Sequence, residues 1–155
     1  MKKDYINWHS KKEQINNLEQ RPFFHEREIW FCYVGVNVGF EQDGQGQDFQ
    51  RPVVIIKKFN NEICWVVSLS KTKRRGEYYF SFPFNEKITS VAILSQIKLI
   101  DVERLSRKIG DMSEDNFRLL VEKLKALLPW AFLFFPPLSW SRAEAICRLM
   151  ISSGE

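Results

Sequence analysis

A long polar loop that ends on an arginine is the first feature of this sequence that could support chemistry. The stretch GFEQDGQGQDFQRP, residues 39–52, lies between two apolar segments and reaches Arg51 directly before Pro52. Connections of this length inside a compact domain are typically functional or mobile. Glu41 and Gln42 supply hydrogen-bonding groups, and Arg51 supplies a permanent cation whose planar donors suit a phosphate. This combination can bind a nucleic-acid backbone.

Arg51 also has a plainer interpretation. A pairing with Asp48 or Glu41 would make the arginine a pin that holds the loop in place. The sequence leaves both interpretations open.

A basic cluster follows the polar strand end at Ser70. Its cations are Lys71, Lys73, Arg74 and Arg75. Short basic turns of this kind are commonly just solvated. A position beside Ser70 would instead bring them to a phosphate that reaches the strand end.

Histidine and cysteine give little support for other chemistries. His9 and His25 are the only histidines, and the sequence has no metal-protease motif, carboxylate cluster or glycine-rich phosphate loop. Cys32, Cys64 and Cys147 are widely spaced and odd in number, so neither a disulfide framework nor a zinc site is indicated. We therefore expect no metal and no cofactor. A Cys–His nucleophile pair stays open, although a buried, inert thiol is the usual state in apolar strands.

Length and charge narrow the class of protein further. The chain has 155 residues, a net charge of +4 and a sequence pI near 9.0, which fits one domain and makes an anionic partner plausible. The N-terminus lacks the apolar core of a signal peptide, and the longest apolar run, 127–138, is short and broken by proline. We expect no export, no membrane span and a cytoplasmic location.

Five segments have the composition of strands and lack a helical period. They are residues 27–35, 51–59, 62–70, 78–82 and 90–100. Asn60 and Asn61 make a tight turn between the second and third segments, which predicts an antiparallel hairpin. Ser95 and Gln96 are expected to mark a kink in the last segment.

Helical spacing occurs on both sides of the strand-rich region. Apolar side chains recur at helical intervals in residues 4–20 and again in residues 113–128. Residues 101–110 are expected to form one short helical turn that ends at Gly110. Because strands and helices do not alternate, the fold class is mainly β, α+β. We expect a small, strongly bent antiparallel sheet or barrel with a C-terminal helix and an extra N-terminal helix.

The motifs occur in an order that resembles the MazF/PemK toxin family. The similar stretches are EIWFCYVGVNVGFEQDGQGQDFQRPVVIIKKF, VVSLS and SVAILSQIKLIDVERLSRKIGDMSED. The resemblance covers roughly residues 27–128. It divides the chain into an N-terminal helical extension, 1–26, a barrel domain, 27–128, and a C-terminal apolar extension, 129–155.

The resemblance implies a compact β-barrel of the CcdB/MazF type that forms a homodimer. It also implies an endoribonuclease that cleaves single-stranded mRNA at short motifs without the ribosome. The implied protein partner is an antitoxin whose disordered segment blocks the RNA groove, with DNA binding in the company of that antitoxin. No membrane and no cofactor are implied.

The family's site residues carry over position by position. Its R-P arginine falls on Arg51, and its catalytic threonine falls on Ser70, which keeps the hydroxyl. Its E-Q pair falls on Glu41 and Gln42. The glutamine of its Q-I-R segment falls on Gln96.

Three other positions depart from the family's pattern. Lys98 replaces the usual arginine of the Q-I-R segment. Some relatives use an arginine and an aspartate just before the glutamine, but Ile93 and Ser95 occupy those positions here. This chain therefore cannot use that acid–base pair.

RNA cleavage without a metal uses the substrate's own 2′-OH as the nucleophile and needs a cation on the phosphorane. Arg51 can supply this cation, and it can help to deliver a proton to the leaving group through water. Ser70 can bind a phosphate oxygen or orient the 2′-OH, and Glu41 is the nearby candidate for the base. The loop would be the lid and sequence-reading wall of the groove. The candidates for RNA binding are Gln42, Lys71, Lys73, Arg74, Arg75, Gln96 and Lys98.

Two other functions stay open at this point. One is a nucleic-acid-binding barrel without catalysis, which Ser70 in place of threonine would fit. The other is a toxin that binds a topoisomerase, as the CcdB branch of this fold does, although that branch lacks the R-P and Q-I-R signatures.

Overall fold

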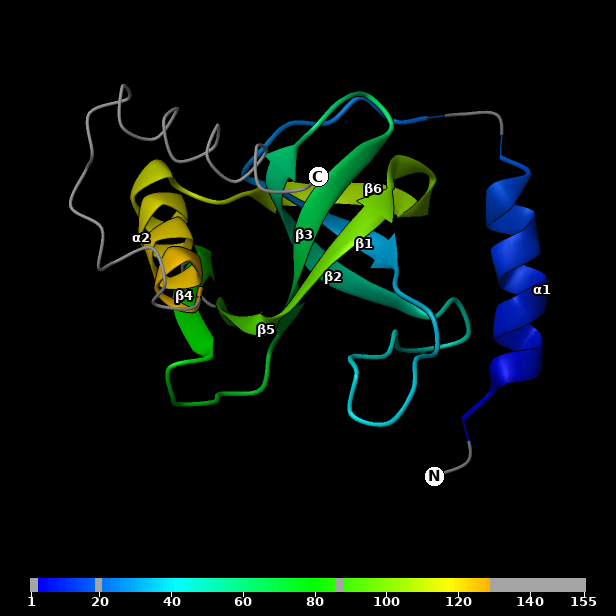
Figure 1. Cartoon of the computed structure of the whole chain (residues 1–155), viewed down its shortest axis with the longest axis horizontal. Coiled ribbons are helices and arrows are strands. Elements are labelled where there is room, and N and C mark those ends of the chain that lie inside the picture. The colour runs from blue at the N-terminus through cyan, green and yellow to red at the C-terminus, as the bar shows by residue number, and fades with distance from the viewer. Residues whose placement is uncertain (1–2, 19–20, 86–87, 129–155) are drawn as a thin grey trace, which may run out of the picture. The chain divides into compact units, whose positions relative to one another are not determined.

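The computed structural model describes residues 3–18, 21–85 and 88–128. Six strands form one antiparallel sheet in the order β4-β5-β3-β2-β1-β6 (Figure 1), and the sheet lies within the unit Met1–Leu124. The strands are β1 Glu28–Tyr33, β2 Gln50–Lys58, β3 Ile63–Ser70, β4 Tyr79–Asn85, β5 Ile88–Asp101 and β6 Leu105–Asp111. The helices are α1 Tyr5–Asn16, the short 3₁₀ helix η1 Val102–Arg104, and α2 Glu114–Ala126. The predicted C-terminal extension, 129–155, lies outside the described residues.

The predicted hairpin is present between β2 and β3. Val53 pairs with Ser68 and Val54 pairs with Val67 in an antiparallel register. The turn is fixed by Asn60, whose side-chain oxygen accepts hydrogen bonds from the backbone N–H groups of Glu62 and Ile63, each at 2.8 Å. An asparagine that bonds its own following backbone is a common way to stabilise a tight turn.

The sheet is bent but not closed. Strand β5 pairs with β4 along its first half and with β3 on both sides of the predicted kink, where the register shifts between Val67 and Leu69. Strands β4 and β6 form the two edges, and within the described residues no pairing joins them. The α+β class and the bent antiparallel sheet agree with the prediction from the sequence. In a closed barrel the two edge strands, β4 and β6, would pair with each other, and here the sheet is open between them.

The helical turn predicted for residues 101–110 is wrong over most of its length. Only Val102–Arg104 is helical, and the chain then continues as β6, which pairs with β1. In β6 only Leu105 is buried, and Ser106, Arg107 and Lys108 are all exposed. Charged side chains are typical of edge strands, where they discourage further pairing. Because these charged residues interrupt the alternation of apolar and polar side chains, the sequence pattern does not indicate a strand here.

The main core lies on one face of β1, β2 and β3. Its fully buried members include Cys32, Val53, Ile55 and Cys64. Burial raises the pKa of both thiols to about 12, so these cysteines are neutral packing residues. Phe24, which precedes β1, is fully buried in the same core.

Helix α1 packs against the protein through a small second core. Trp8 and Ile15 form this core with Phe49, and Tyr33 and Val36 lie against it. The helix starts at Asp4, whose side chain accepts a hydrogen bond from the Asn7 N–H at 3.1 Å. The prediction of a helix within residues 4–20 is therefore confirmed. Among the helices described, none is long and apolar enough to cross a membrane.

Candidate active site

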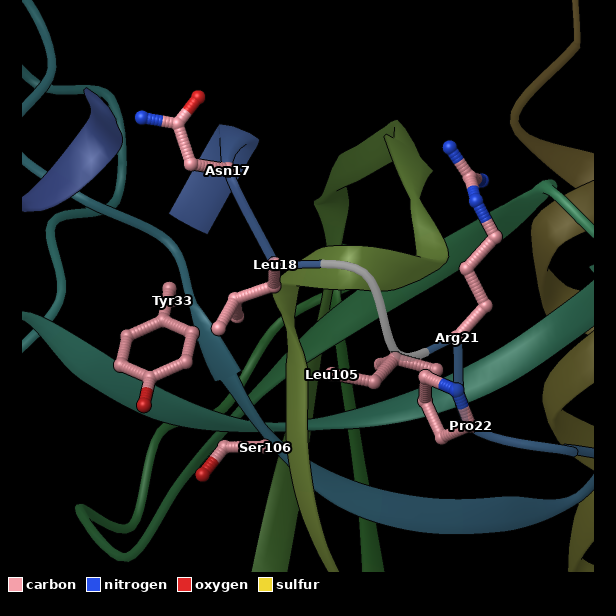
Figure 2. A pocket seen from close by; sticks show the side chains of 7 residues that line it. All are labelled: Asn17, Leu18, Arg21, Pro22, Tyr33, Leu105 and Ser106. Carbon is pink, nitrogen blue, oxygen red and sulfur yellow. The ribbon is translucent and has the colours of Figure 1, made fainter. Parts of the chain in front are cut away.

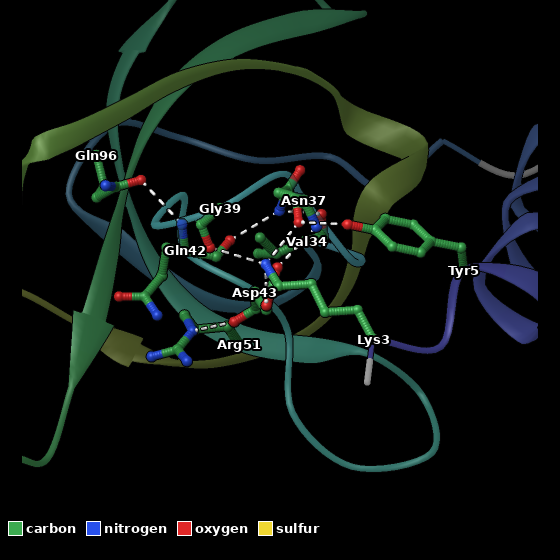
Figure 3. A network of polar contacts seen from close by, with 9 residues as sticks. All are labelled: Lys3, Tyr5, Val34, Asn37, Gly39, Gln42, Asp43, Arg51 and Gln96. Atoms are coloured by element: carbon green, nitrogen blue, oxygen red, sulfur yellow. Dashed lines mark hydrogen bonds and ion pairs between the residues drawn. The ribbon is translucent and has the colours of Figure 1, made fainter. Parts of the chain in front are cut away.

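Arg51 lies at the start of β2 and is buried, with 8% of its surface exposed. Its Nε donates a hydrogen bond to the backbone carbonyl of Asp43 at 2.7 Å (Figure 3). Among the described residues, no carboxylate forms an ion pair with Arg51. No described residue accepts a hydrogen bond from its two terminal nitrogens. Burial lowers the pKa of Arg51, and the Asp43 charge opposes this effect.

The plainer interpretation of Arg51 is not supported by the geometry. Asp48 forms its ion pair with Lys11 of α1, at 2.9 Å. Glu41 is exposed, and its charge acts on Lys98, whose pKa it raises against a larger lowering by burial. Neither carboxylate is found in an ion pair with Arg51 in the part of the chain that the structure describes.

The loop between β1 and β2 is held by a chain of hydrogen bonds (Figure 3). The Asn37 backbone N–H donates to Asp43 Oδ1 at 2.6 Å, and the Asn37 side chain donates to the Gln42 carbonyl at 2.8 Å. The Gln42 N–H in turn donates to Gln96 Oε1 of β5 at 3.1 Å. Gln42 and Gln96, both predicted to bind RNA, are therefore in direct contact with each other.

Two glycines let this loop fold closely on itself and on α1. Gly35 has a positive φ of 83°, and a Cβ there would collide with the indole of Trp8. At Gly44 a Cβ would collide with the backbone of Phe49. The Gly44 N–H donates a hydrogen bond to the Gly35 carbonyl at 2.7 Å. A larger residue at either position would force Trp8 or the loop backbone to move.

Ser70 is the last residue of β3 and is partly buried. Ser68 pairs with Val53, so Ser70 and Arg51 each lie two residues beyond this pair, at the same end of the β2–β3 hairpin. The Ser70 Oγ accepts a hydrogen bond from the Thr72 N–H at 3.1 Å. A hydroxyl that accepts one bond can still donate its proton to a ligand oxygen.

The basic cluster follows Ser70 as an exposed turn. Arg74 donates to the Tyr79 hydroxyl at 3.3 Å, and its guanidinium lies 5.7 Å from the centre of that ring. The charge of Arg74 contributes to the lowered pKa of Arg51, so the two cations are close enough to interact. The other members of the cluster, Lys71, Lys73 and Arg75, are exposed.

Lys98 lines a cavity of about 370 Å³ together with Ser68 and Arg104. It pairs with Val66 across β3 and β5, and therefore shares a face of the sheet with Ser68. Burial lowers the pKa of Lys98, and the neighbouring Arg104 lowers it further. Arg104 was not predicted as a site residue, because its place beside the sheet depends on η1.

A larger pocket, of about 700 Å³, is shown in Figure 2. It is lined by Asn17, Leu18, Arg21, Pro22, Tyr33, Leu105 and Ser106. Its cation, Arg21, already pairs with Asp101 at 3.2 Å and with Glu103 at 3.1 Å. This pocket is therefore a weaker candidate for an anionic ligand than the surroundings of Arg51.

The structure brings part of the predicted site together. Arg51, Gln42 and Gln96 meet through the loop, and Arg74 lies within electrostatic reach of Arg51. Glu41 lies toward Lys98 instead, with no described contact to Arg51. Besides Arg104, the sequence did not single out Asp43, although Asp43 stands inside the quoted loop.

Comparisons with known proteins agree with the region marked out by the motifs. A sequence model of PemK-like, MazF-like toxins of type II toxin-antitoxin systems matches residues 26–128. No curated protein sequence matches the chain.

Solved structures share the fold at low sequence identity. MazF (Form-I) from Deinococcus radiodurans is 12% identical with a TM-score of 0.54, and the match covers 70% of this chain and 97% of that one. An endoribonuclease from a Mycobacterial species is 17% identical with a TM-score of 0.52, over 72% and 99% of the two chains. A Mycobacterial endoribonuclease solved with its cognate antitoxin is 14% identical with a TM-score of 0.52, over 70% and 99%.

Proposed function

The chain belongs to the family of PemK-like, MazF-like toxins, and from that premise we propose that it is a toxin that cleaves single-stranded RNA. We further propose that a cognate antitoxin holds it inactive, as the antitoxin-bound Mycobacterial endoribonuclease suggests by its fold. In this proposal the catalytic domain is 27–128, it acts as a homodimer in the cytoplasm, and it binds DNA together with its antitoxin.

One observation carries the proposal: Arg51 is a buried cation without a carboxylate partner among the described residues. Removing a charge from water is unfavourable unless an opposite charge compensates for it. Its terminal nitrogens, which are engaged by no described residue, match the two oxygens of a phosphate. A phosphodiester bound at this point would supply the missing anion.

The proposed reaction proceeds without a metal. The substrate 2′-oxygen attacks the adjacent phosphorus as its proton passes to a base, and the bond to the 5′-oxygen breaks as that oxygen takes up a proton. The products are a 2′,3′-cyclic phosphate and a 5′-hydroxyl. Arg51 stabilises the added charge on the phosphorane, and Ser70 hydrogen-bonds a phosphate oxygen or orients the 2′-OH.

The proton acceptor in this proposal is Glu41. Glu41 is exposed and lies toward Lys98, so it would have to approach the 2′-OH as RNA binds. Other parts of the RNA would contact the basic cluster, the Gln42–Gln96 pair and Lys98. The loop over Arg51 would read the sequence.

The test is to incubate the purified protein with a defined single-stranded RNA in EDTA and to analyse the fragment ends. We expect fragments that carry a 2′,3′-cyclic phosphate, and no cleavage of the same sequence annealed into a duplex. RNA that is bound but stays intact would contradict catalysis and favour the non-catalytic binding protein. Protein that neither binds nor cleaves RNA would favour the topoisomerase-directed toxin.

A further inference from the structure

We propose that Lys3 is a positioning residue for Arg51, acting through the loop residue Asp43. This inference rests on the proposed role of Arg51 in catalysis. Lys3 precedes the region 26–128 that matches the toxin family, so its contribution would be an addition made by the N-terminal extension of this chain.

Lys3 ties together two parts of the β1–β2 loop. Its ammonium forms an ion pair with Asp43 Oδ2 at 2.9 Å and donates to the backbone carbonyls of Asn37 at 2.6 Å and Gly39 at 3.0 Å (Figure 3). A single side chain thus holds both the outgoing and the returning arms of the loop. Its side chain is about three-quarters buried, at 24% exposed, so it is not a freely solvated lysine.

Asp43 is the link between Lys3 and Arg51. Its carboxylate binds Lys3 and accepts the Asn37 N–H, while its backbone carbonyl accepts the hydrogen bond from Arg51 Nε. Because the guanidinium is planar, a fixed partner at Nε also fixes the directions of the two terminal N–H groups. The position of Asp43 therefore sets the direction in which Arg51 presents its free donors.

Helix α1 provides further anchors that hold Lys3 in place. Trp8 packs against Gly35 at the start of the loop, and its ring contacts Phe49 at a centroid distance of 5.7 Å. Lys11 pairs with Asp48 at 2.9 Å near the end of the loop. The extension thus follows the loop from end to end, and Lys3 is the anchor nearest to the residue that holds Arg51.

The experiment compares Lys3→Met with Lys12→Met in RNA cleavage at saturating and limiting substrate. Lys12 is an exposed lysine of α1 with no described ion pair, so it controls for loss of one charge. We expect kcat to fall about tenfold in Lys3→Met, less than the hundredfold that a 1 Å misplacement can cost. KM should change less than twofold, and Lys3→Arg should recover most of kcat. Lys12→Met should match the wild type.

A second measurement does not depend on activity. The Nε–Hε resonance of Arg51, assigned by its absence in Arg51→Ala, reports directly on the hydrogen bond to Asp43. We expect it to shift or broaden in Lys3→Met and in Asp43→Asn, and to stay in place in Lys12→Met. If the wild type fails to cleave RNA, the proposed function fails, while this resonance still decides the positioning role.

Lys3→Met and Asp43→Asn can also be combined to test whether the two residues act through the same contact. Asp43→Asn keeps an oxygen for the Asn37 N–H but loses the charge that Lys3 binds, so the double variant should be no worse than either single one. Thermal unfolding identifies a variant that has lost its fold, and the other variant then carries the test. The proposal is overturned if folded Lys3→Met retains both the wild-type kcat and the wild-type Arg51 resonance.

Discussion

Two charged residues of this sheet are buried to the same extent but have opposite surroundings. Glu28 on β1 is 7% exposed and Arg51 on β2 is 8% exposed. Glu28 binds the Lys108 ammonium at 2.9 Å, and it accepts hydrogen bonds from Trp30 Nε1 at 2.8 Å and from the His25 N–H at 3.0 Å. Arg51 donates one described hydrogen bond, to a neutral carbonyl.

The difference separates a structural charge from one that is open to a ligand. Burial raises the pKa of Glu28, but the bonds from Lys108, His25 and Trp30 outweigh it and hold that pKa at about 2. For Arg51, burial is the largest effect and lowers the pKa of the guanidinium. Burial alone therefore does not distinguish the two roles. The partners that each charge has within the protein do.

Arg51→Ala should abolish most RNA cleavage while leaving the stability of the fold nearly unchanged. We expect cleavage to fall by about a hundredfold or more, as removal of one charge-stabilising donor typically does. The free energy of unfolding should change by less than about 1 kcal/mol, because the lost hydrogen bond and the relieved burial of a charge oppose each other. Cleavage assays and urea titrations measure the two effects. A folded Arg51→Ala protein that cuts RNA at the parental rate would refute the role of Arg51.

Glu28→Gln should produce the reverse pattern. Removing the carboxylate charge leaves Lys108 without its buried partner, and we expect a loss of about 2 kcal/mol in the free energy of unfolding. Cleavage per folded molecule should stay within about twofold of the wild type, measured well below the unfolding temperature. A large loss of cleavage in the folded variant would mean that Glu28 also serves the site.

The pH dependence of stability should show the contribution of Glu28 directly. Its pKa is lowered from 4.5 to about 2 in the folded protein, so its contribution is present above the unfolded pKa and is lost as the pH falls toward the folded one. Wild-type stability should therefore fall more steeply than that of Glu28→Gln between about pH 5 and pH 2.5. Parallel curves for the two proteins, from urea titrations at each pH, would show that Glu28 is not the linked group.

Of the substitutions considered, Arg74→Ala should have the smallest effect, and it should act on RNA binding. Losing one phosphate contact should raise KM about threefold and reduce the slope of log affinity against log salt by about 1. The matched control is Arg118→Ala on α2, which removes one charge from an exposed pair with Asp115. Equal salt slopes for the two variants would argue against contact between Arg74 and RNA.

Most of the sheet could be predicted because the inner strands consist mainly of apolar side chains. The strands around the Asn60 turn, and the helix that contains Trp8 and Ile15, follow from composition and spacing. Strand β6 could not be found in this way, because one face of it meets water at the sheet edge. Its charged residues, Arg107 and Lys108, carry no strand signal of their own.

The candidate site was predictable in part, for a different reason. Arg51 stands out as the cation that ends a polar loop, and this much is visible along the chain. What holds Arg51 is a backbone carbonyl, and any residue type at position 43 would supply one. Lys3 contacts that loop across a large separation in sequence, which only the packing of α1 establishes.

The contact between Lys3 and the loop has a practical consequence for the design of recombinant protein. A purification tag joined ahead of Lys3 would place extra chain and charge beside the ion pair with Asp43. Cleavage rates measured on tagged and untagged protein are then not interchangeable. A tag that can be removed completely, with any cleavage compared before and after its removal, avoids mistaking an artefact of cloning for a property of the protein.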